Sequence, residues 1–253
     1  PRRWVALGVI AIAQLMVVLD ASIVNIALPS AQHSLHISDA NRQWVITAYA
    51  LAFGGLLLLG GRIADYMGRK RAFVIGLVGF GLASAIGGIA ENQGELFAAR
   101  GLQGAFAALM APAALSLITI TFTEPRERAR AFAVYGGISG GGAALGLILG
   151  GVLTEYASWR WTLLVNTPIA IGTAIAGALV VRESRAEGKP HYDIPGVITS
   201  TLGLVALVYG FTKANESGWS ATSTVTLLIV AVVLLAAFVL IERNTAEPLL
   251  PTR

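Results

Sequence analysis

The chain has 253 residues, of which 55% are hydrophobic and 13% charged, and its mean hydropathy is +0.71. Soluble domains carry about twice that charged fraction, so the composition excludes an ordinary soluble fold and predicts a membrane protein. The net charge is +4, and the absence of cysteine excludes disulfides, thiol catalysis and cysteine-ligated metals.

Eight apolar segments follow one another along the chain. Each is close to the ~20 residues that a helix needs to cross a bilayer. They do not alternate in polarity as barrel strands do, so the expected fold class is an all-α, polytopic helical membrane protein. The predicted spans are residues 4–28, 44–61, 72–90, 96–122, 131–153, 161–181, 194–212 and 222–241.

The basic residues are distributed unevenly between the two sides of these spans. With the N-terminus in the cytoplasm, fourteen of the 18 lie on the cytoplasmic side, three on the outer side and one inside a span. The positive-inside rule therefore predicts a multi-pass protein of the cell (inner) membrane with both ends of this chain cytoplasmic. Because the net charge reports topology, no nucleic-acid partner is expected.

A polar stretch at 182–193 is the expected internal boundary. It separates a six-span bundle over 1–182 from a second unit over 183–253, which holds a cytoplasmic loop and two further spans. Asp193 is the expected cap of the seventh span. Because the chain begins with Pro1 rather than Met, it is expected to be a fragment or a trimmed form.

Two ionisable residues remain well inside the spans, Asp20 in the first and Arg100 in the fourth. Each costs ~2.5–3.5 kcal/mol at a helix centre on insertion scales, so each needs a partner or a function. Helical rise places them about 6 and 12 Å to the outer side of the span centres, a difference that an arginine side chain bridges. We expect them either to titrate in a polar cavity or to form a static ion pair.

Further polar residues accompany these two charges. Gln14 and Asn25 are eleven residues apart in the first span and face the same way, whereas Asp20 points to another side. Gln103 lies near Arg100, whose own helix face is lined by glycine and alanine. Such small residues leave room for another helix or for a substrate.

Two glycine-containing motifs stand out. In the fifth span Gly142, Gly146 and Gly150 recur every four residues, a spacing that lets two helix backbones approach closely. The turn between the second and third spans places Asp65 ahead of a basic cluster. This order of acid, turn and base predicts a hydrogen-bonded latch.

With these motifs the chain resembles the major facilitator superfamily, and within it the drug:proton antiporters with fourteen spans. Arg100, Gln103 and Gly104 match the span 4 motif. One departure is Leu147, which stands where the antiporter motif usually carries a proline. The other matching positions are residues 19–29 in span 1, Gly61, Asp65, Gly68, Arg69 and Lys70 after span 2, Gly142, Gly146, Gly150 and Gly151 in span 5, and residues 159–161 with Asn166 and Pro168 at span 6.

The resemblance implies a six-helix bundle plus two extra transmembrane helices, with the C-terminal six-span bundle absent from this chain. It implies export of drug-like, amphiphilic or cationic small molecules in exchange for protons, within the lipid bilayer and without a cofactor or metal. The implied roles are proton coupling for Asp20 and Arg100, a substrate cavity for Gln14, Asn25, Gln103 and Asn166, cytoplasmic gating for Gly61, Asp65, Gly68, Arg69 and Lys70, and the antiporter helix for Gly142, Gly146, Gly150 and Gly151.

Several alternatives remain open at this point. The same fold serves transporters of metabolites, lipids or peptides without drug specificity, and a channel or assembly subunit is a further alternative. An intramembrane enzyme is disfavoured, because no His-Glu-x-x-His motif, aspartate pair or serine–lysine arrangement lies within the spans, and an ATP-driven exporter is disfavoured because no phosphate-binding loop is present. His33 and His36 suit a solvated loop better than a metal site.

Overall fold

The computed structural model describes residues 2–185 and 194–244, and within them every regular element is a helix. Among these described residues, eight helical crossings are long and apolar enough to span a membrane, which confirms the expected number. The helices are α1 Arg2–Ser34, α2 Trp44–Met67, α3 Arg69–Gly88, α4 Gln93–Thr121, α5 Pro125–Tyr156, α6 Trp161–Leu164, α7 Asn166–Val180, α8 Ile194–Ser217 and α9 Thr222–Asn244.

The helix ends differ from the predicted span ends, because a helix does not stop where the hydrocarbon layer stops. α1 continues through Pro29 to Ser34, and α5 begins at Pro125, where the missing proline N–H belongs to the first turn and costs no hydrogen bond. The sixth crossing, predicted as one helix over 161–181, is divided into α6 and α7 at Val165. Pro168 contributes to this division, since it cannot donate to the carbonyl of Leu164.

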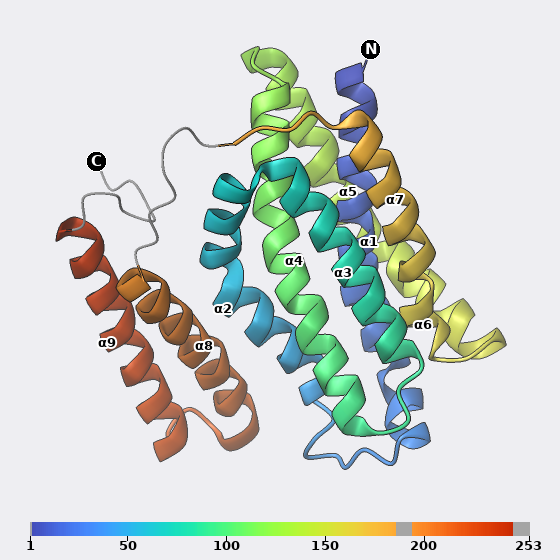
Figure 1. Cartoon of the computed structure of the whole chain (residues 1–253). Coiled ribbons are helices and arrows are strands. Elements are labelled where there is room, and N and C mark those ends of the chain that lie inside the picture. The colour runs from blue at the N-terminus through green and yellow to red at the C-terminus, as the bar shows by residue number, and fades with distance from the viewer. Residues whose placement is uncertain (1, 186–193, 245–253) are drawn as a thin grey trace.

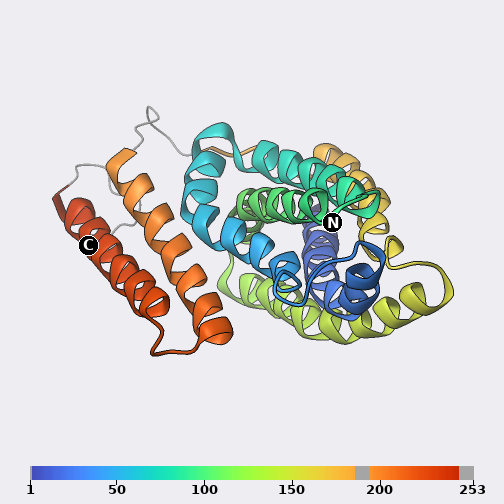
Figure 2. The ribbon, with the colours of Figure 1, turned by 90° about the horizontal axis from the view of Figure 1, so that it is seen from below.

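The crossings run side by side as a bundle, with the α8–α9 hairpin along one flank (Figures 1 and 2). The N-terminus, the α2–α3 turn and the C-terminal end of α7 lie at the same end of the bundle (Figure 1). The hairpin contacts the bundle through α2, where Gly54 and Gly55 face Val208 and Val205 of α8. The expected division at residue 183 stays a prediction, and the predicted cap Asp193 lies outside the described residues.

Glycines set the closest helix–helix contacts. A Cβ on Gly104 of α4 would meet the backbone oxygen of Tyr49 in α2, and one on Gly60 would meet the backbone of Ala108. In α5, Gly142, Gly146 and Gly150 all pack against α1, whereas Gly151 of that predicted set has open space around it. The small-residue faces predicted on spans 4 and 5 therefore serve helix packing in this structure.

The buried apolar residues form two clusters at different heights. One contains Met16, Phe80 and Ala107, towards the end that carries the N-terminus. The other contains Val24 and Leu96, towards the opposite end. Asp20, Arg100 and the residues that bond them lie between the two clusters along the same helices.

Candidate functional site

Asp20 is fully buried, with 0% of its surface exposed, and both of its oxygens are bonded. Oδ2 accepts a hydrogen bond from Nη1 of Arg100 at 2.6 Å. Oδ1 accepts from Nε2 of Gln103 at 3.1 Å and from Nδ2 of Asn166 at 2.9 Å. One cation and two amide donors converge on this carboxyl group, so the arrangement suits its ionised form.

Arg100 is held from three directions. Its Nε donates to the carbonyl of Val45 in α2 at 3.1 Å, and its Nη1 also donates to Oε1 of Gln103 at 2.8 Å. The guanidinium lies over the ring of Tyr49, 4.7 Å from its centroid, a favourable cation–π position. Arg100 therefore joins α1 and α2 to α4.

Ser84 and Asn166 extend the network to α3, α6 and α7. The Ser84 hydroxyl accepts from Gln103 and Asn166, each at 3.1 Å, and donates to the carbonyl of Leu163 in α6 at 2.7 Å. Ser84 is the single hydroxyl or charged side chain of the predicted span 72–90, the signal by which the sequence could have revealed it. The second amide atom, Oδ1 of Asn166, is buried and has no bonding partner among the described residues.

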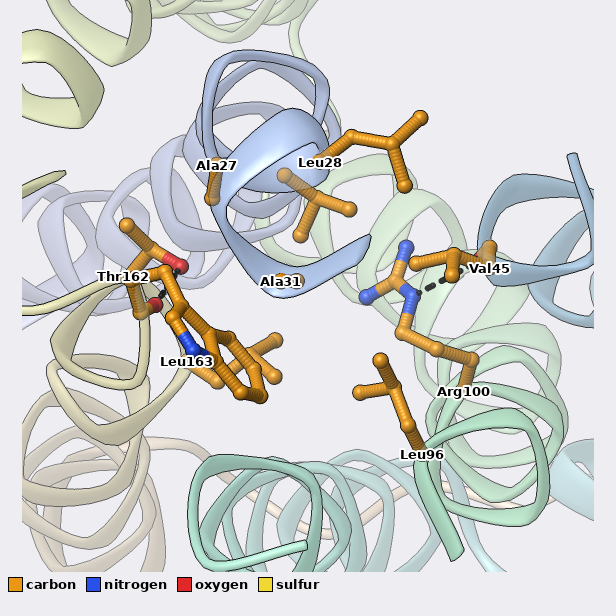
Figure 3. Close-up of a pocket in the computed structure, with 10 residues that line it drawn as sticks. Ala27, Leu28, Ala31, Val45, Leu96, Arg100, Thr162 and Leu163 are labelled. Carbon is orange, nitrogen blue, oxygen red and sulfur yellow. Dashed lines mark hydrogen bonds between the residues drawn. The ribbon is translucent and has the colours of Figure 1, made fainter. Parts of the chain in front are cut away.

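A small cavity lies beside Arg100 on the side away from the N-terminus. Its volume of about 10 Å³ is room for about one water molecule. Figure 3 shows the guanidinium pointing into the region between Leu28 and Val45, with Ala27, Ala31 and Leu163 on the facing side. Because Arg100 itself is only 2% exposed, the network is closed to bulk water in this conformation.

The four predicted cavity residues occupy three different places. Gln103 and Asn166 belong to the buried network. Gln14 bonds to α5 instead, donating to the Ser139 hydroxyl at 3.0 Å and accepting from the Tyr135 hydroxyl at 2.6 Å, while Asn25 is exposed and donates to its own helix. Their contribution to a substrate cavity stays a prediction.

The turn between α2 and α3 forms a tight, charged corner. Asp65 pairs with Arg69 through contacts of 3.0 Å to Nε and 2.9 Å to Nη2. Gly68 has a φ of 110°, which a residue with a side chain rarely adopts, so the glycine is required for the turn. Gly61 faces Pro112 of α4, and Lys70 lies in the first turn of α3.

Glu183, just beyond α7, completes this corner and was missed by the sequence reasoning. Its Oε1 accepts from the backbone N–H of Lys70 at 3.1 Å, and its Oε2 lies 3.7 Å from Nε of Arg71. The backbone N–H of Arg69 donates to the carbonyl of Ser184 at 2.9 Å. A carboxylate distant in sequence thus caps the N-terminus of α3, where negative charge is favoured.

We expect Glu183→Ala to destabilise the protein by about 1 kcal/mol, the usual cost of losing an N-terminal cap. The purified protein should melt at a lower temperature, measured by intrinsic fluorescence in detergent. Glu155→Ala is the matched control, because Glu155 is exposed at the opposite end of the bundle. Equal shifts in the two variants would show that the cap contributes nothing.

In the described residues, histidine, aspartate and glutamate nowhere gather in groups of three that could hold a metal ion.

The amino-acid sequence is similar to known proteins over nearly its whole length. The family model of the Major Facilitator Superfamily matches residues 10–252. The chain belongs to the Major Facilitator Superfamily. It is therefore a multi-pass membrane protein of a transporter family and not an enzyme.

Its relatives in this superfamily include resistance and export proteins. The chain is 57% identical to the puromycin resistance protein pur8 of Streptomyces alboniger over 99% of its length and 50% of the relative's. It is 42% identical to the cephamycin export protein CmcT of Amycolatopsis lactamdurans, with 95% of this chain and 50% of that protein covered. The chain thus spans about half the length of these relatives.

Solved structures agree with the fold. A bacterial homologue of the human lysosomal transporter Spinster matches with a TM-score of 0.63 and 15% identity, over 98% of this chain and 77% of that one. The human organic anion transporter MFSD10 matches with a TM-score of 0.62 and 14% identity, over 89% of this chain and 59% of that one. Similarity at this level supports the major facilitator architecture alone.

Proposed function

We propose that the chain forms the first bundle and two central helices of a fourteen-span exporter, which expels drug-like molecules in exchange for protons. The main support for this proposal is the buried Asp20–Arg100 ion pair. Ionisable side chains inside a membrane are costly, so those that are present usually have a function. The names of the relatives support export of antibiotics, and they make puromycin the first substrate to test.

Asp20 is the proposed proton carrier. When it is ionised, its bonds hold α1 against α4 and α7. Protonation removes the charge that Arg100 and the two amides bond, so the three helices lose their shared anchor. Once protonated, the Asp20 carboxyl group becomes a hydrogen-bond donor. Rotation of the Asn166 side-chain amide would then bring its buried, unbonded Oδ1 to Asp20 as an acceptor.

The proton is proposed to arrive from the outer side. The positive-inside rule assigns the end with the N-terminus and the α2–α3 turn to the cytoplasm. The small cavity beside Arg100 then lies on the outer side of the network and offers the shorter route for water. One charge moving inward across 100 mV releases ~2.3 kcal/mol, which is enough for a roughly forty-fold substrate gradient.

Transport is proposed to need a second bundle, because alternating access moves two bundles about a midplane site. Gln14, Asn25, Gln103 and Asn166 are the proposed contributors to that site. The corner built from Gly61, Asp65, Gly68, Arg69 and Lys70 is the proposed cytoplasmic latch against the second bundle. Gly142, Gly146 and Gly150 keep α5, the proposed antiporter helix, close to α1.

Asp20→Asn in the full-length protein tests the proposal. In proteoliposomes with an imposed pH gradient, we expect puromycin movement to stop responding to the gradient, while puromycin still binds. Asp39→Asn is the matched control, because Asp39 is an exposed loop carboxylate and should leave coupling intact. Gradient-driven transport that survives in Asp20→Asn would remove Asp20 from the proton pathway. Failure of the unmodified protein to move puromycin or any other drug would instead favour a metabolite, lipid or peptide substrate.

A further inference from the structure

A second, larger pocket lies at the end of the bundle that carries the N-terminus. It has a volume of about 720 Å³ and is formed where α1 begins and where α4 and α7 end. Arg2, Arg3 and Arg182 supply its positive charges. Nothing in the proposed transport cycle uses this pocket.

One acidic residue, Glu183, also lines the pocket, but it and Glu127, the partner of Arg3, are already bonded. Glu127 pairs with Arg3 at 2.7 Å, and Glu183 accepts the backbone N–H of Lys70 at the N-terminus of α3. Across residues 2–185 and 194–244, no carboxylate forms an ion pair with either Arg2 or Arg182. The positive potential of these two guanidinium groups is therefore available to an external anion.

The carbonyl groups just beyond the end of α4 do not account for the two arginines either. Arg128 donates to the carbonyls of Phe122 and Thr123, at 2.8 and 3.3 Å. These carbonyls belong to the C-cap residue of α4 and to the residue after it. Because a different arginine bonds them, neither Arg2 nor Arg182 is needed to satisfy these two carbonyls.

One wall of the pocket is apolar and continues to the lipid-facing surface. Leu117, Ile120 and Val180 line it. Ile120 is 42% exposed, and Leu179, the neighbour of Val180 in α7, is 79% exposed. A small soluble anion gains nothing from such a wall, whereas a phospholipid brings a phosphate group and an acyl chain together.

We propose that this pocket binds an anionic phospholipid, with its phosphate between Arg2 and Arg182 and an acyl chain along Ile120 and Val180. Guanidinium groups bond phosphate oxygens in pairs, which gives the site geometric selectivity beyond charge attraction. Basic pockets between membrane helices are known to take lipid headgroups. The site joins the start of α1, the helix that carries Asp20, to the end of α7, the helix whose Asn166 bonds Asp20.

Lipid titration of the purified full-length protein, followed by native mass spectrometry, tests the proposal with phosphatidylglycerol and phosphatidylcholine as probes. We expect phosphatidylglycerol to bind more tightly. Arg2→Gln and Arg182→Gln should each weaken its binding about 5-fold, since a basic residue near the surface contributes about that factor. Arg126→Gln and Arg130→Gln are matched controls at exposed positions at the same end of the bundle, and should change binding less than either pocket variant.

Three results would overturn the proposal. Equal losses in the pocket and control variants would indicate general charge attraction, and equal affinity for the two lipids would exclude an anionic headgroup. Displacement of phosphatidylglycerol by millimolar inorganic phosphate would indicate a soluble-anion site. If the pocket variants do not fold, the unmodified protein is labelled with photoreactive phosphatidylglycerol and the labelled residues are identified. Labelling of α1 near Arg2 and of α4 near Ile120 supports the site, and labelling elsewhere refutes it.

Discussion

In the full-length protein, Arg100→Gln should abolish the proposed transport and destabilise the bundle by about 3–5 kcal/mol, the usual cost of leaving one partner of a buried ion pair alone. The substitution removes the 2.6 Å contact to Asp20, the bond to the Val45 carbonyl and the cation over Tyr49. Thermal melting in detergent and drug efflux from cells measure the two effects separately. Asp20 would be the group left without its cation.

The double variant Asp20→Asn/Arg100→Gln separates electrostatics from packing. With both charges removed no uncompensated charge remains, so the double variant should melt above Arg100→Gln alone, while proton-driven transport stays absent. Arg130→Gln controls for the loss of an arginine at an exposed position and should behave as the unmodified protein. A double variant that is no more stable than Arg100→Gln would show that the charge of Asp20 is not the source of the instability.

Gly104→Ala should destabilise the contact between α2 and α4 by about 1–3 kcal/mol, the usual cost of overpacking. The added methyl group would collide with the backbone oxygen of Tyr49 and lie 3.0 Å from the backbone nitrogen of Phe53. Neither atom can move without shifting α2. That shift would also displace the Tyr49 ring from Arg100, so in the full-length protein the proposed transport should fall together with the melting temperature.

Gly101→Ala is the matched control on the same helix, three residues earlier. A Cβ there meets nothing within 4 Å, so the change should be neutral or stabilising by up to about 1 kcal/mol from helix propensity. The comparison is made by thermal melting of both purified variants under identical conditions. Equal stability in the two variants would mean that α2 and α4 approach less closely than the structure has them.

The glycine pattern predicted close helix packing but not the helices that would be in contact. Four-residue spacing in the fifth span predicted close packing, and Gly142, Gly146 and Gly150 do pack on α1. The same spacing did not predict which helix would be the partner. On the fourth span, the glycine and alanine face next to Arg100 was compatible with contact to either a helix or a substrate. In the structure, α2 packs against this face at Gly104.

The sixth crossing and the α2–α3 corner show why the sequence did not predict some other features of the structure. Apolar residues continue on both sides of residues 166–168, so hydropathy predicted a single helix there, and the local signal of Pro168 was not used to divide it. Glu183 looked like an ordinary loop charge. Its position as the cap of α3 depends on a contact between residues 113 positions apart, and sequence spacing carries no information on such a contact.

The sequence by itself determined the number of crossings, because bilayer thickness dictates the length of each apolar run. It also singled out Asp20 and Arg100, because an ionisable side chain far from a span end is too costly to be incidental. Only the tertiary structure decided that Ser84, Asn166 and the Val45 carbonyl meet these two charges. Such meetings depend on how each helix is rotated and where it crosses its neighbours, and these quantities arise from packing of the whole bundle.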